Sequence, residues 1–578
     1  MEQDYTVVVL GSGIAGSITA LALQQLGIKT LVVERGSHPR FAIGESTLPT
    51  TTFLLRHFAE RFRIPELAEI CSYEGLNKHR CVAWPKQIFW FGVHREGEAL
   101  PARHESINEA LLAPLGPDVH MLRADVDAFL VSLFAKYGVD YVEHAEVSRF
   151  QADADGVTLD VRTGGKEARV NAQFVVDATG HGSALSKQLG LRDDEARLLT
   201  NTRSIFGHFR GVKDLDEALG ERNPSMRFRR SAGTMHHCFP GGWFWVIPFD
   251  DGVTSVGLQL DRRTFPLDTS ISAGQELDAF IRRFPDVARH LGDMTPIRTL
   301  VRTDRVQFTS RTILSERFIA TPHAAAFVEP LFSTGIMLTL SFIDRFIPAA
   351  LAAYTDKDWR IERFRFIDEL LSAEIGQIDL LVDGTIQAFR DYDLFKQYWR
   401  AWVIGTIVQY GCCILSGGAT RERPMLYGAG IDAFAGDLKS MHDLVCMTDA
   451  DPAVLARSVQ ELIDPWWQKL VAPITWTIGD FSLGSPDSVN VVTEPLEMSG
   501  IRQFFATLIE AYRLSNPLRK GASLNAWIAV AMLDFQRHIA TYGQANSASA
   551  DFQKARERIF AQAHPDVFDY RRAVGQPA

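Results

Sequence analysis

The chain has 578 residues, and 60 Lys and Arg against 70 Asp and Glu give it a formal net charge of −10. Apolar residues make up 46% and charged residues 22%, which excludes a disordered or fibrous chain, and the length allows about three to four soluble domains or fewer large ones. The acidic balance argues against a nucleic-acid binder, because a phosphate backbone requires clustered Lys and Arg.

The N-terminus reads as a nucleotide-binding unit. The apolar run Thr6–Leu10 predicts a buried parallel strand, and it leads into Gly11-Ser12-Gly13-Ile14-Ala15-Gly16. An amphipathic helix follows, and a second strand over 30–33 ends at Glu34. Such glycines let the backbone approach a pyrophosphate at a helix N-terminus, and a carboxylate at this distance binds ribose. The unit therefore predicts dinucleotide binding.

A second segment identifies the dinucleotide as FAD. Phe174–Gly180 is a short apolar strand ending in Asp-x-x-Gly, and its pairing with the first loop resembles the FAD-dependent monooxygenase superfamily. No second complete fingerprint follows, because Gly428-Ala429-Gly430 lacks a preceding strand. We therefore expect one FAD and no NAD(P)H fold. The expected FAD contacts are Gly11, Gly13, Ile14, Ala15, Gly16, Glu34, Arg35, Gly44, Glu45, Ser46, Arg123, Asp177, Gly180 and Pro330.

The middle of the chain carries an aromatic strand, Trp243-Phe244-Trp245-Val246-Ile247-Pro248. Alternation places Trp243, Trp245 and Ile247 on one face. A turn at 250–252 then leads to a second strand over Ser255–Leu260, which predicts a hairpin. By periodicity alone, the tryptophans simply fill a core.

Two motifs give a more specific reading. Trp243–Pro248 matches the WxWxIP signature of flavin-dependent halogenases, and Phe327, Pro330, Ser333 and Gly335 complete the family's FxxPxxSxG signature. The resemblance runs from about residue 5 to at least 350, and more loosely to about 420. The segment Gly233–His237 resembles the corresponding sequence in the family branch that chlorinates the pyrrole ring of monodechloroaminopyrrolnitrin.

The resemblance implies an α/β fold. A Rossmann-like FAD domain of the glutathione-reductase type would interleave with an antiparallel β-sheet substrate domain, and a C-terminal helical region would follow. The halogenase core would span 1–355, with FAD parts at about 1–75, 120–190 and 290–355 and sheet parts at about 76–119 and 191–289. The helical region would span 356–578.

The resemblance also implies a reaction. Reduced flavin and O2 form a C4a-hydroperoxide, and chloride or bromide attacks it to give hypohalous acid. A lysine then hydrogen-bonds the acid or becomes a haloamine and halogenates an electron-rich ring in secondary metabolism. A separate NAD(P)H-dependent flavin reductase would supply FADH2.

The residues for this chemistry follow from the same motifs. Lys86 precedes the aromatic run 88–91 and is the expected catalytic lysine, with Lys78 as the alternative. The N–H groups of Thr334 and Gly335 would hold the halide. Ser333 would relay hydrogen bonds, or the Ser-Thr pair would cap a helix over Ile336–Phe346. The residues expected to shield the tunnel are Trp243, Trp245, Ile247 and Phe332.

One departure from the family concerns the substrate. Tryptophan-specific members carry a glutamate immediately before the serine, where this chain has Phe332. A pyrrole or phenol, free or tethered to a carrier protein, is therefore favoured over free tryptophan. Glu329 is a candidate base, although a helix-dipole or ribityl contact is an equal alternative.

The cysteine pattern and the N-terminal sequence bear on where the protein is located. The six cysteines form no CxxC pair, which argues against disulfides and a metal site, and the N-terminus lacks a signal-like region, so we expect a cytoplasmic protein. The uncharged stretch 401–420 contains Gln409, Tyr410 and four glycines, which favours a core helix over a membrane span. Two alternatives remain: a flavin-dependent aromatic monooxygenase (hydroxylase) and a flavin-binding scaffold without catalysis.

Overall fold

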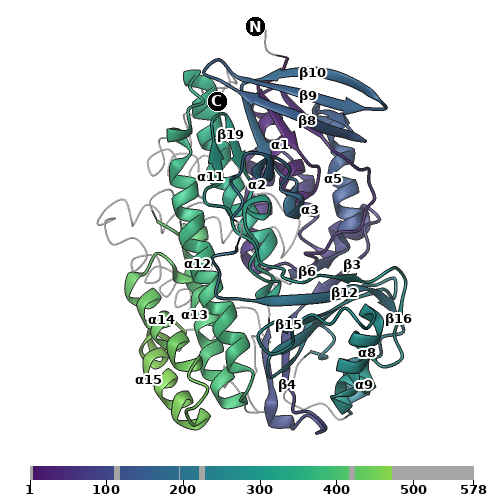
Figure 1. Ribbon diagram of the computed structural model, residues 1–578, viewed down its shortest axis with the longest axis vertical. Coiled ribbons are helices and arrows are strands. Elements are labelled where there is room, and N and C mark those ends of the chain that lie inside the picture. Colours follow the sequence, from purple (N-terminus) through teal and green to yellow (C-terminus); the bar gives the residue numbers. More distant parts are fainter. Residues whose placement is uncertain (1–3, 110–117, 194, 221–227, 416–422, 472–578) are drawn as a thin grey trace, which may run out of the picture.

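The computed structural model describes residues 4–109, 118–193, 195–220, 228–415 and 423–471 (Figure 1). Residues 472–578 of the predicted C-terminal region lie outside this part. A six-stranded and a three-stranded sheet occupy the upper half of Figure 1, and an eight-stranded sheet occupies the lower half.

The six-stranded sheet carries the predicted nucleotide-binding unit. Its order is β18-β19-β11-β1-β2-β7, and only the edge strand β18 is antiparallel to its neighbour. The strands are β1 (Val7–Leu10), β2 (Thr30–Val33), β7 (Asp140–Val142), β11 (Phe174–Asp177), β18 (Leu314–Ser315) and β19 (Phe318–Ala320). β1 is buried and has parallel neighbours on both sides, so the predicted buried parallel strand is confirmed.

Two glycines make the first turn possible. Gly11 has φ +91°, and a Cβ there would lie 2.6 Å from the carbonyl oxygen of Ala178. A Cβ on Gly16 would lie 1.9 Å from the carbonyl oxygen of Gly11. Only glycine fits both positions, so α1 (Ile14–Gln25) begins directly against β1 and β11.

The eight-stranded sheet has the order β16-β12-β15-β14-β13-β4-β5, with β17 also paired to β12. Its strands are β4 (Ile88–Val93), β5 (Glu105–Glu109), β12 (Thr202–Arg210), β13 (Gly233–Phe239), β14 (Gly242–Pro248), β15 (Thr254–Asp261), β16 (Thr295–Pro296) and β17 (Val301–Arg302). The predicted hairpin is confirmed as β14–β15. The sheet is mixed rather than antiparallel, because β4 and β13 are parallel. It also recruits β16 and β17, which the sequence placed in an FAD part.

The two faces of this sheet contribute to different cores. Trp243, Trp245 and Ile247 lie in the main hydrophobic cluster, whereas Phe244 and Val246 pack in a second cluster with α8 (Ala273–Arg282) and α9 (Pro285–Leu291). The predicted alternation along β14 is therefore confirmed. The main cluster faces the rest of the molecule, where the functional residues gather.

Two smaller sheets complete the β-structure. The three-stranded meander comprises β8 (Ala145–Ala152), β9 (Val157–Thr163) and β10 (Lys166–Ala172). The antiparallel pair of β3 (Ala83–Lys86) and β6 (Asp118–Met121) joins segments that are far apart in the sequence. The shorter helices are α2 (Pro49–Arg61), α3 (Glu66–Glu69), α4 (Tyr73–Lys78), α5 (Arg123–Tyr137), α6 (Ala184–Gln188), α7 (Leu215–Leu219) and α10 (Pro322–Ala325).

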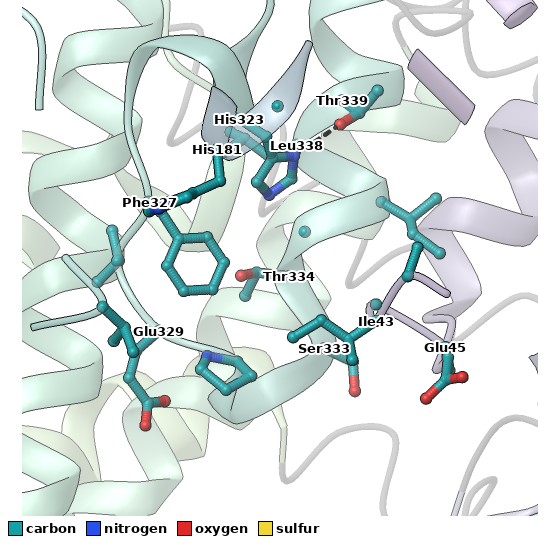
Figure 2. Close-up of a pocket in the computed structure, with 18 of the residues that line it drawn as sticks. Ile43, Glu45, His181, His323, Phe327, Glu329, Ser333, Thr334, Leu338 and Thr339 are labelled. Atoms are coloured by element: carbon teal, nitrogen blue, oxygen red, sulfur yellow. Dashed lines mark hydrogen bonds between the residues drawn. The ribbon is translucent and has the colours of Figure 1, made fainter. Parts of the chain in front are cut away.

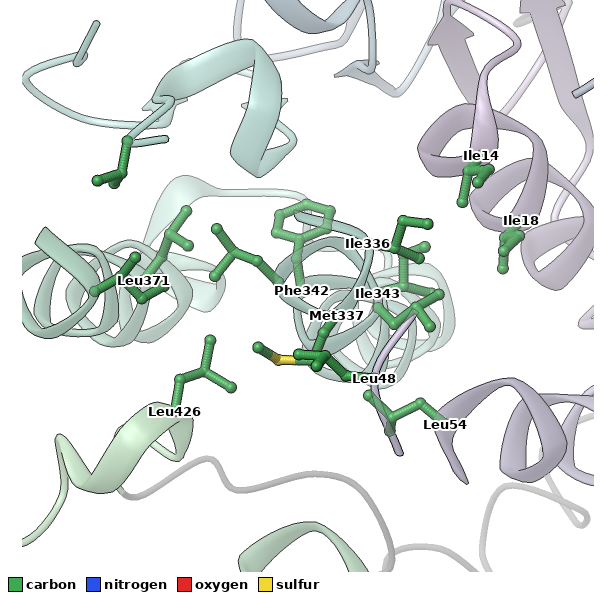
Figure 3. Close-up of a cluster of buried hydrophobic side chains, with 14 of the residues drawn as sticks. Ile14, Ile18, Leu48, Leu54, Ile336, Met337, Phe342, Ile343, Leu371 and Leu426 are labelled. Carbon is green, nitrogen blue, oxygen red and sulfur yellow. The ribbon is translucent and has the colours of Figure 1, made fainter. Parts of the chain in front are cut away.

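A long central helix, α11 (Thr334–Asp356), organises the core (Figure 3). Its side chains Ile336 and Ile343 lie toward Ile14 and Ile18 of α1, and Phe342 stacks on Phe346 of the same helix. The segment Leu331–Asp356 is long and apolar enough to cross a membrane, but 89% of its most apolar window is buried inside the protein. It is therefore placed as a core helix.

The C-terminal helices pack on the same core. They are α12 (Arg365–Ala388), α13 (Tyr392–Leu415), α14 (Asp432–Val445) and α15 (Pro452–Leu470), so the predicted helical character is confirmed as far as residue 471. The uncharged stretch lies in α13 up to residue 415, and Trp402 and Gln409 are buried there. Gln409 donates to Thr50 of α2 at 2.9 Å, which joins this region to the N-terminal unit.

Candidate active site

A cavity of about 860 Å³ lies between the ends of β1 and β11, the inner face of β14 and the start of α11. Figure 2 shows Ser333, Thr334 and His323 from the α11 side of this cavity and Ile43 and Glu45 from a loop opposite. The predicted residues that line it are Gly13, Ile14, Ala15, Gly44, Glu45, Ser46, Arg123, Gly180, Trp243, Trp245, Ile247, Glu329, Pro330, Ser333, Thr334 and Gly335. Predicted FAD, halide and shielding residues thus share one cavity.

Other predicted residues lie outside the cavity lining: Gly11, Gly16, Glu34, Arg35, Lys86, Asp177 and Phe332. Gly11 and Gly16 instead allow α1 to begin directly against β1 and β11, as described above. Asp177 accepts hydrogen bonds from the backbone N–H groups of Thr179 and Leu185, both at 3.0 Å, and so shapes the loop that lines the cavity. Arg35 is exposed.

Glu34 holds the glycine loop from within. Its carboxylate accepts hydrogen bonds from the backbone N–H and the hydroxyl of Ser12, both at 2.9 Å, and from Gly36 N–H at 2.8 Å. Burial alone would raise the pKa of Glu34, but the N–H groups of Gly36 and Ser12 and the charge of Arg40 hold it below its usual value. The carboxylate is therefore charged, and it fixes the turn at which a nucleotide would bind.

Two arginines converge on Gly13. Guanidinium nitrogens of Arg123 and Arg40 lie 3.7 and 3.8 Å from the position of a Cβ on that glycine. Arg123 is held by Asp127 through bonds of 3.0 Å and donates to the carbonyl of Ile43 at 2.9 Å. The Nε atom of Arg40 is buried and has no partner within the described ranges. Two cations beside a bare glycine backbone fit a pyrophosphate.

The backbone before α11 is unusual. Phe332 and Ser333 have φ values of +69° and +56°, which non-glycine residues rarely adopt and which cluster at functional sites. Ser333 is the N-cap of α11, but its side chain makes no capping hydrogen bond, so the predicted capping role is wrong. The first N–H groups of a helix have no intrahelical partner, and the residues that carry them here, Thr334 and Gly335, line the cavity.

His323 lies against this helix start. One ring nitrogen, Nδ1, is hydrogen bonded to Thr339 at 3.2 Å, and the other, Nε2, lies 3.1 Å from where a Cβ on Gly335 would be (Figure 2). Burial lowers the pKa of His323 to about 4, with the charge of Arg123 adding to the effect. The ring is therefore neutral at physiological pH. Sequence reasoning missed His323, which stands outside both motifs.

Glu329 joins the two family motifs. Its carboxyl group accepts hydrogen bonds from Trp243 Nε1 at 2.9 Å and from Leu331 N–H at 2.7 Å. Burial raises the pKa of Glu329 to about 8, although both hydrogen bonds oppose this shift. Trp245, whose indole N–H donates to Ser255 Oγ at 3.2 Å, lies beside Trp243 with ring centroids 6.0 Å apart. The cavity wall thus combines two indoles and a neutral carboxyl group.

Lys86 is fully buried and does not line the cavity. Its Nζ donates to the carbonyl of Thr47 at 2.6 Å, next to the cavity residue Ser46, and stands 3.5 Å from the ring centroid of Phe89. Burial lowers the pKa of Lys86, and the charge of Asp118 opposes the shift. The Lys78 side chain is 64% exposed and pairs with Glu69, so of the two candidate lysines Lys86 is the buried one. Lys86 ends β3 instead of opening the aromatic strand, which begins at Ile88.

A polar network connects Lys86's strand pair to the cavity. His120 of β6 and Ser46 both hydrogen bond to the hydroxyl of Thr234, at 2.9 and 3.0 Å. Burial holds the pKa of His120 well below its usual value. Sequence reasoning missed His120 because its strand pairs with β3 across more than thirty residues of chain.

One side-chain cluster has metal-ligand character. Within the described ranges, Asp383, His442 and Cys446 are the group whose ligand atoms lie within 4.8 Å of one another. Asp383 is also bound by the Arg263 guanidinium at 2.7 Å, and the pKa of His442 is raised to about 10: burial opposes the rise, and the hydrogen bond to Asp383 outweighs it. The arrangement is that of an ion-paired network, and none of its members lines the cavity.

Comparisons with known proteins agree on one family. The family model described as Tryptophan halogenase matches residues 6–69 and 93–384. The monodechloroaminopyrrolnitrin halogenase PrnC of Pseudomonas fluorescens is 35% identical over 414 residues, which cover 70% of this chain and 72% of that protein. The tetracycline 7-halogenase of Kitasatospora aureofaciens is 34% identical over 417 residues, with coverage of 70% and 74%.

A solved structure gives the same result. The crystal structure of halogenase PltM in complex with phloroglucinol and FAD superposes with a TM-score of 0.74 at 27% identity, covering 81% of this chain and 97% of that one.

Proposed function

Because the chain belongs to the tryptophan halogenase family of flavin-dependent halogenases, we propose that it halogenates a small electron-rich aromatic ring, such as a pyrrole or phenol. FAD, a halide and O2 are the cofactor and co-substrates of this enzyme class. Bound reduced FAD and O2 supply the oxidising power that turns chloride or bromide into hypohalous acid. The residues of the chain bind, orient and separate the reactants.

For the cofactor, the Gly13 backbone with Arg40 and Arg123 would hold the pyrophosphate, and the loop of Gly44, Glu45 and Ser46 would contact the rest of FAD. Glu34 would contact the ribose from the end of β2.

For the halide, the N–H groups of Thr334 and Gly335 would be the donors, since backbone N–H groups at a helix start bind anions. Ser333 would act as a hydrogen-bonding relay between the halide position and Lys86. A neutral Glu329 would favour the halide, because a charged carboxylate in the same dry cavity would repel it.

The position of Lys86 carries the proposal. It is a fully buried amine beside the cavity but behind its lining, with Trp243 and Trp245 on the cavity side. Hypohalous acid is small enough to reach such a lysine, whereas an aromatic substrate near Lys86 would be kept from the flavin. Lys86 would either hydrogen-bond the acid or become a haloamine.

The substrate would be other than free tryptophan. Phe332 stands where tryptophan-specific members carry a glutamate, and it stacks on Trp402 with ring centroids 4.9 Å apart. We place the reaction in the cytoplasm in secondary metabolism, with a separate NAD(P)H-dependent flavin reductase and a substrate that is free or tethered to a carrier protein.

The test combines purified protein, FAD, a flavin reductase, NADH, O2 and chloride or bromide with free and carrier-tethered pyrroles, phenols and indoles. Mass spectrometry should find a halogenated ring, and none with Lys86→Ala. Lys78→Ala is the matched control and should keep full activity. Hydroxylated product without halogen would instead support the aromatic monooxygenase alternative, and halogenation by Lys86→Ala would contradict the role of the lysine.

A further inference from the structure

Lys86 has a carboxylate as its cross-strand neighbour. Lys86 ends β3 and Asp118 begins β6, and the two are paired directly in the antiparallel ladder. Residues opposite one another in such a pair project from the same face, with Cβ atoms about 5 Å apart. The exposed fractions of Lys86 and Asp118 are 0% and 1%, so both ionisable groups share one dry region.

The two groups are nevertheless engaged elsewhere. Lys86 Nζ donates to the Thr47 carbonyl at 2.6 Å, and Asp118 Oδ1 accepts from the Thr52 hydroxyl at 3.1 Å. The second carboxylate oxygen, Oδ2, is buried and has no hydrogen-bond partner among the described residues. An unpaired buried carboxylate oxygen is costly, which indicates a site for a hydrogen-bond donor that a ligand brings.

The surroundings of this oxygen fit an aromatic ligand. Phe89 lies under Lys86, and Trp402 meets Phe89 edge-on with ring centroids 5.3 Å apart. Gln409 Oε1 is a second buried acceptor without a partner in the described part of the chain. Helix α2 bonds to both of these side chains. Its Thr52 hydroxyl donates to Asp118, and its Thr50 hydroxyl accepts from the Gln409 amide nitrogen. None of Asp118, Phe89, Trp402 and Gln409 lines the FAD cavity.

We propose that Asp118 binds the O–H or N–H group of the aromatic substrate beside Lys86 and accepts the proton that leaves the halogenated carbon. The inference rests on the proposed halogenation. It assigns to β6 the carboxylate that this chain lacks before Ser333, where Phe332 stands.

The step balances without a further reactant. The ring carbon forms a bond to the halogen of hypohalous acid as the halogen–oxygen bond breaks, and Lys86 ammonium protonates the departing hydroxide to give water. The ring then loses its proton to the Asp118 carboxylate. Transfer of that proton from Asp118 to the neutral Lys86 amine restores both groups.

The electrostatic setting supports this exchange. Burial raises the pKa of Asp118 and lowers that of Lys86, which brings their proton affinities together. The other titratable or charged groups that interact with Asp118 or Lys86 are Arg56 of α2, Cys71, His120 of β6, His236 of β13 and Tyr410 of α13. Burial keeps the two histidines neutral and raises the pKa of Cys71 and of Tyr410, so Lys86 and Asp118 form the pair that can exchange a proton.

The test uses the holoenzyme and two probes of equal ring substitution, phloroglucinol and 1,3,5-trimethoxybenzene, of which only the first has O–H groups. Taurine traps hypohalous acid that escapes when no arene is present. With Asp118→Asn, trapped hypohalous acid should stay within about twofold of wild type, while kcat/KM for phloroglucinol falls by about 100-fold, the size expected for a lost proton acceptor. The wild-type preference for phloroglucinol over its methyl ether should also collapse.

Controls separate this role from folding and from the proposed function. Asp118→Glu should recover part of the activity. Asp125→Asn removes a carboxylate that accepts a hydrogen bond from Val82 N–H at 2.9 Å, just before β3. This variant should keep the wild-type preference for phloroglucinol over its methyl ether. Three outcomes would contradict the inference. The first is a preference for phloroglucinol that survives in Asp118→Asn, and the second is equal turnover of both probes by the wild type. The third is a loss of trapped hypohalous acid in Asp118→Asn. Absence of hypohalous acid with wild type contradicts the proposed function instead.

Discussion

Glu329 links the stability of the protein to pH. The folded protein keeps this carboxyl group protonated up to about pH 8, whereas the unfolded chain ionises it near the ordinary value of 4.5. Between these values the unfolded state binds fewer protons. The free energy of unfolding should therefore fall as pH rises from about 4.5 to 8, by up to about 1.4 kcal/mol per pH unit from this group. Urea unfolding across this range measures the slope.

Glu329→Gln is the matched variant, because an amide cannot ionise. It places one N–H donor against the donor of Trp243 or Leu331, and this opposition should cost about 1–3 kcal/mol at every pH, while the variant escapes the fall in stability that ionisation of Glu329 causes in the wild type. The difference between wild type and variant should therefore shrink as pH rises toward 8. A constant difference over this range would show that Glu329 is ionised in the folded protein.

The start of α11 depends on a glycine. A Cβ on Gly335 would lie 3.1 Å from His323 Nε2, so Gly335→Ala should push the imidazole away and narrow the proposed halide position. We expect KM for chloride to rise about tenfold with unchanged FAD affinity. A rise of this size corresponds to about 1.4 kcal/mol. Steady-state halogenation at varied chloride measures it.

Gly376→Ala in α12 is the control for this helix substitution. A Cβ at Gly376 meets nothing within 4 Å, so the change should leave KM for chloride unaltered and stabilise the helix by up to about 1 kcal/mol. Unchanged chloride kinetics in Gly335→Ala would remove the halide from the start of α11.

The hairpin β14–β15 carries the two tryptophans that we propose shield the cavity, and a change in its packing would test that role. A Cβ on Gly257 would lie 2.1 Å from the ring of Trp245. Gly257→Ala should therefore displace Trp245 and increase the fraction of NADH consumed without halogenated product. Comparing NADH oxidation with product by mass spectrometry measures this fraction. An unchanged ratio in a folded, FAD-binding variant would mean that Trp245 does not shield the cavity.

Elements that depend on neighbouring residues could be predicted from the sequence. The glycine turn, the alternation along β14 and the helix after Ser333 are encoded within a few residues, and the structure contains all three. The β3–β6 pair could not be predicted, because its register joins Lys86 to Asp118 through contacts that no local period encodes. Lys86 also lies between the two ranges that the family model matches.

At the scale of the whole molecule, the cavity that we propose binds FAD lies between the six-stranded and the eight-stranded sheets. Cavity-lining residues come from Gly13 beside the six-stranded sheet and from Trp243 in the eight-stranded sheet. FAD should therefore stabilise the whole protein, by about 2.7 kcal/mol at a concentration 100 times Kd. Differential scanning calorimetry with and without FAD measures this.

Arg123→Ala should weaken FAD binding and reduce that stabilisation, because it removes a cation from the glycine loop and the bond to Ile43. Arg169→Ala, on the exposed face of β10, is the control and should leave the FAD effect unchanged. Equal FAD stabilisation in both variants would contradict the pyrophosphate assignment.

The placement of Lys86 outside the cavity lining matters for directed evolution. Phe89 contacts Lys86, Trp402 packs on Phe89, and Gln409 lies one helix turn and more along α13 from Trp402, yet none of the three lines the cavity that would hold FAD. Libraries at these positions should change which ring carbon receives the halogen while oxidant production stays constant. Catalyst engineers could therefore screen regioselectivity and oxidant yield as two independent traits of one gene.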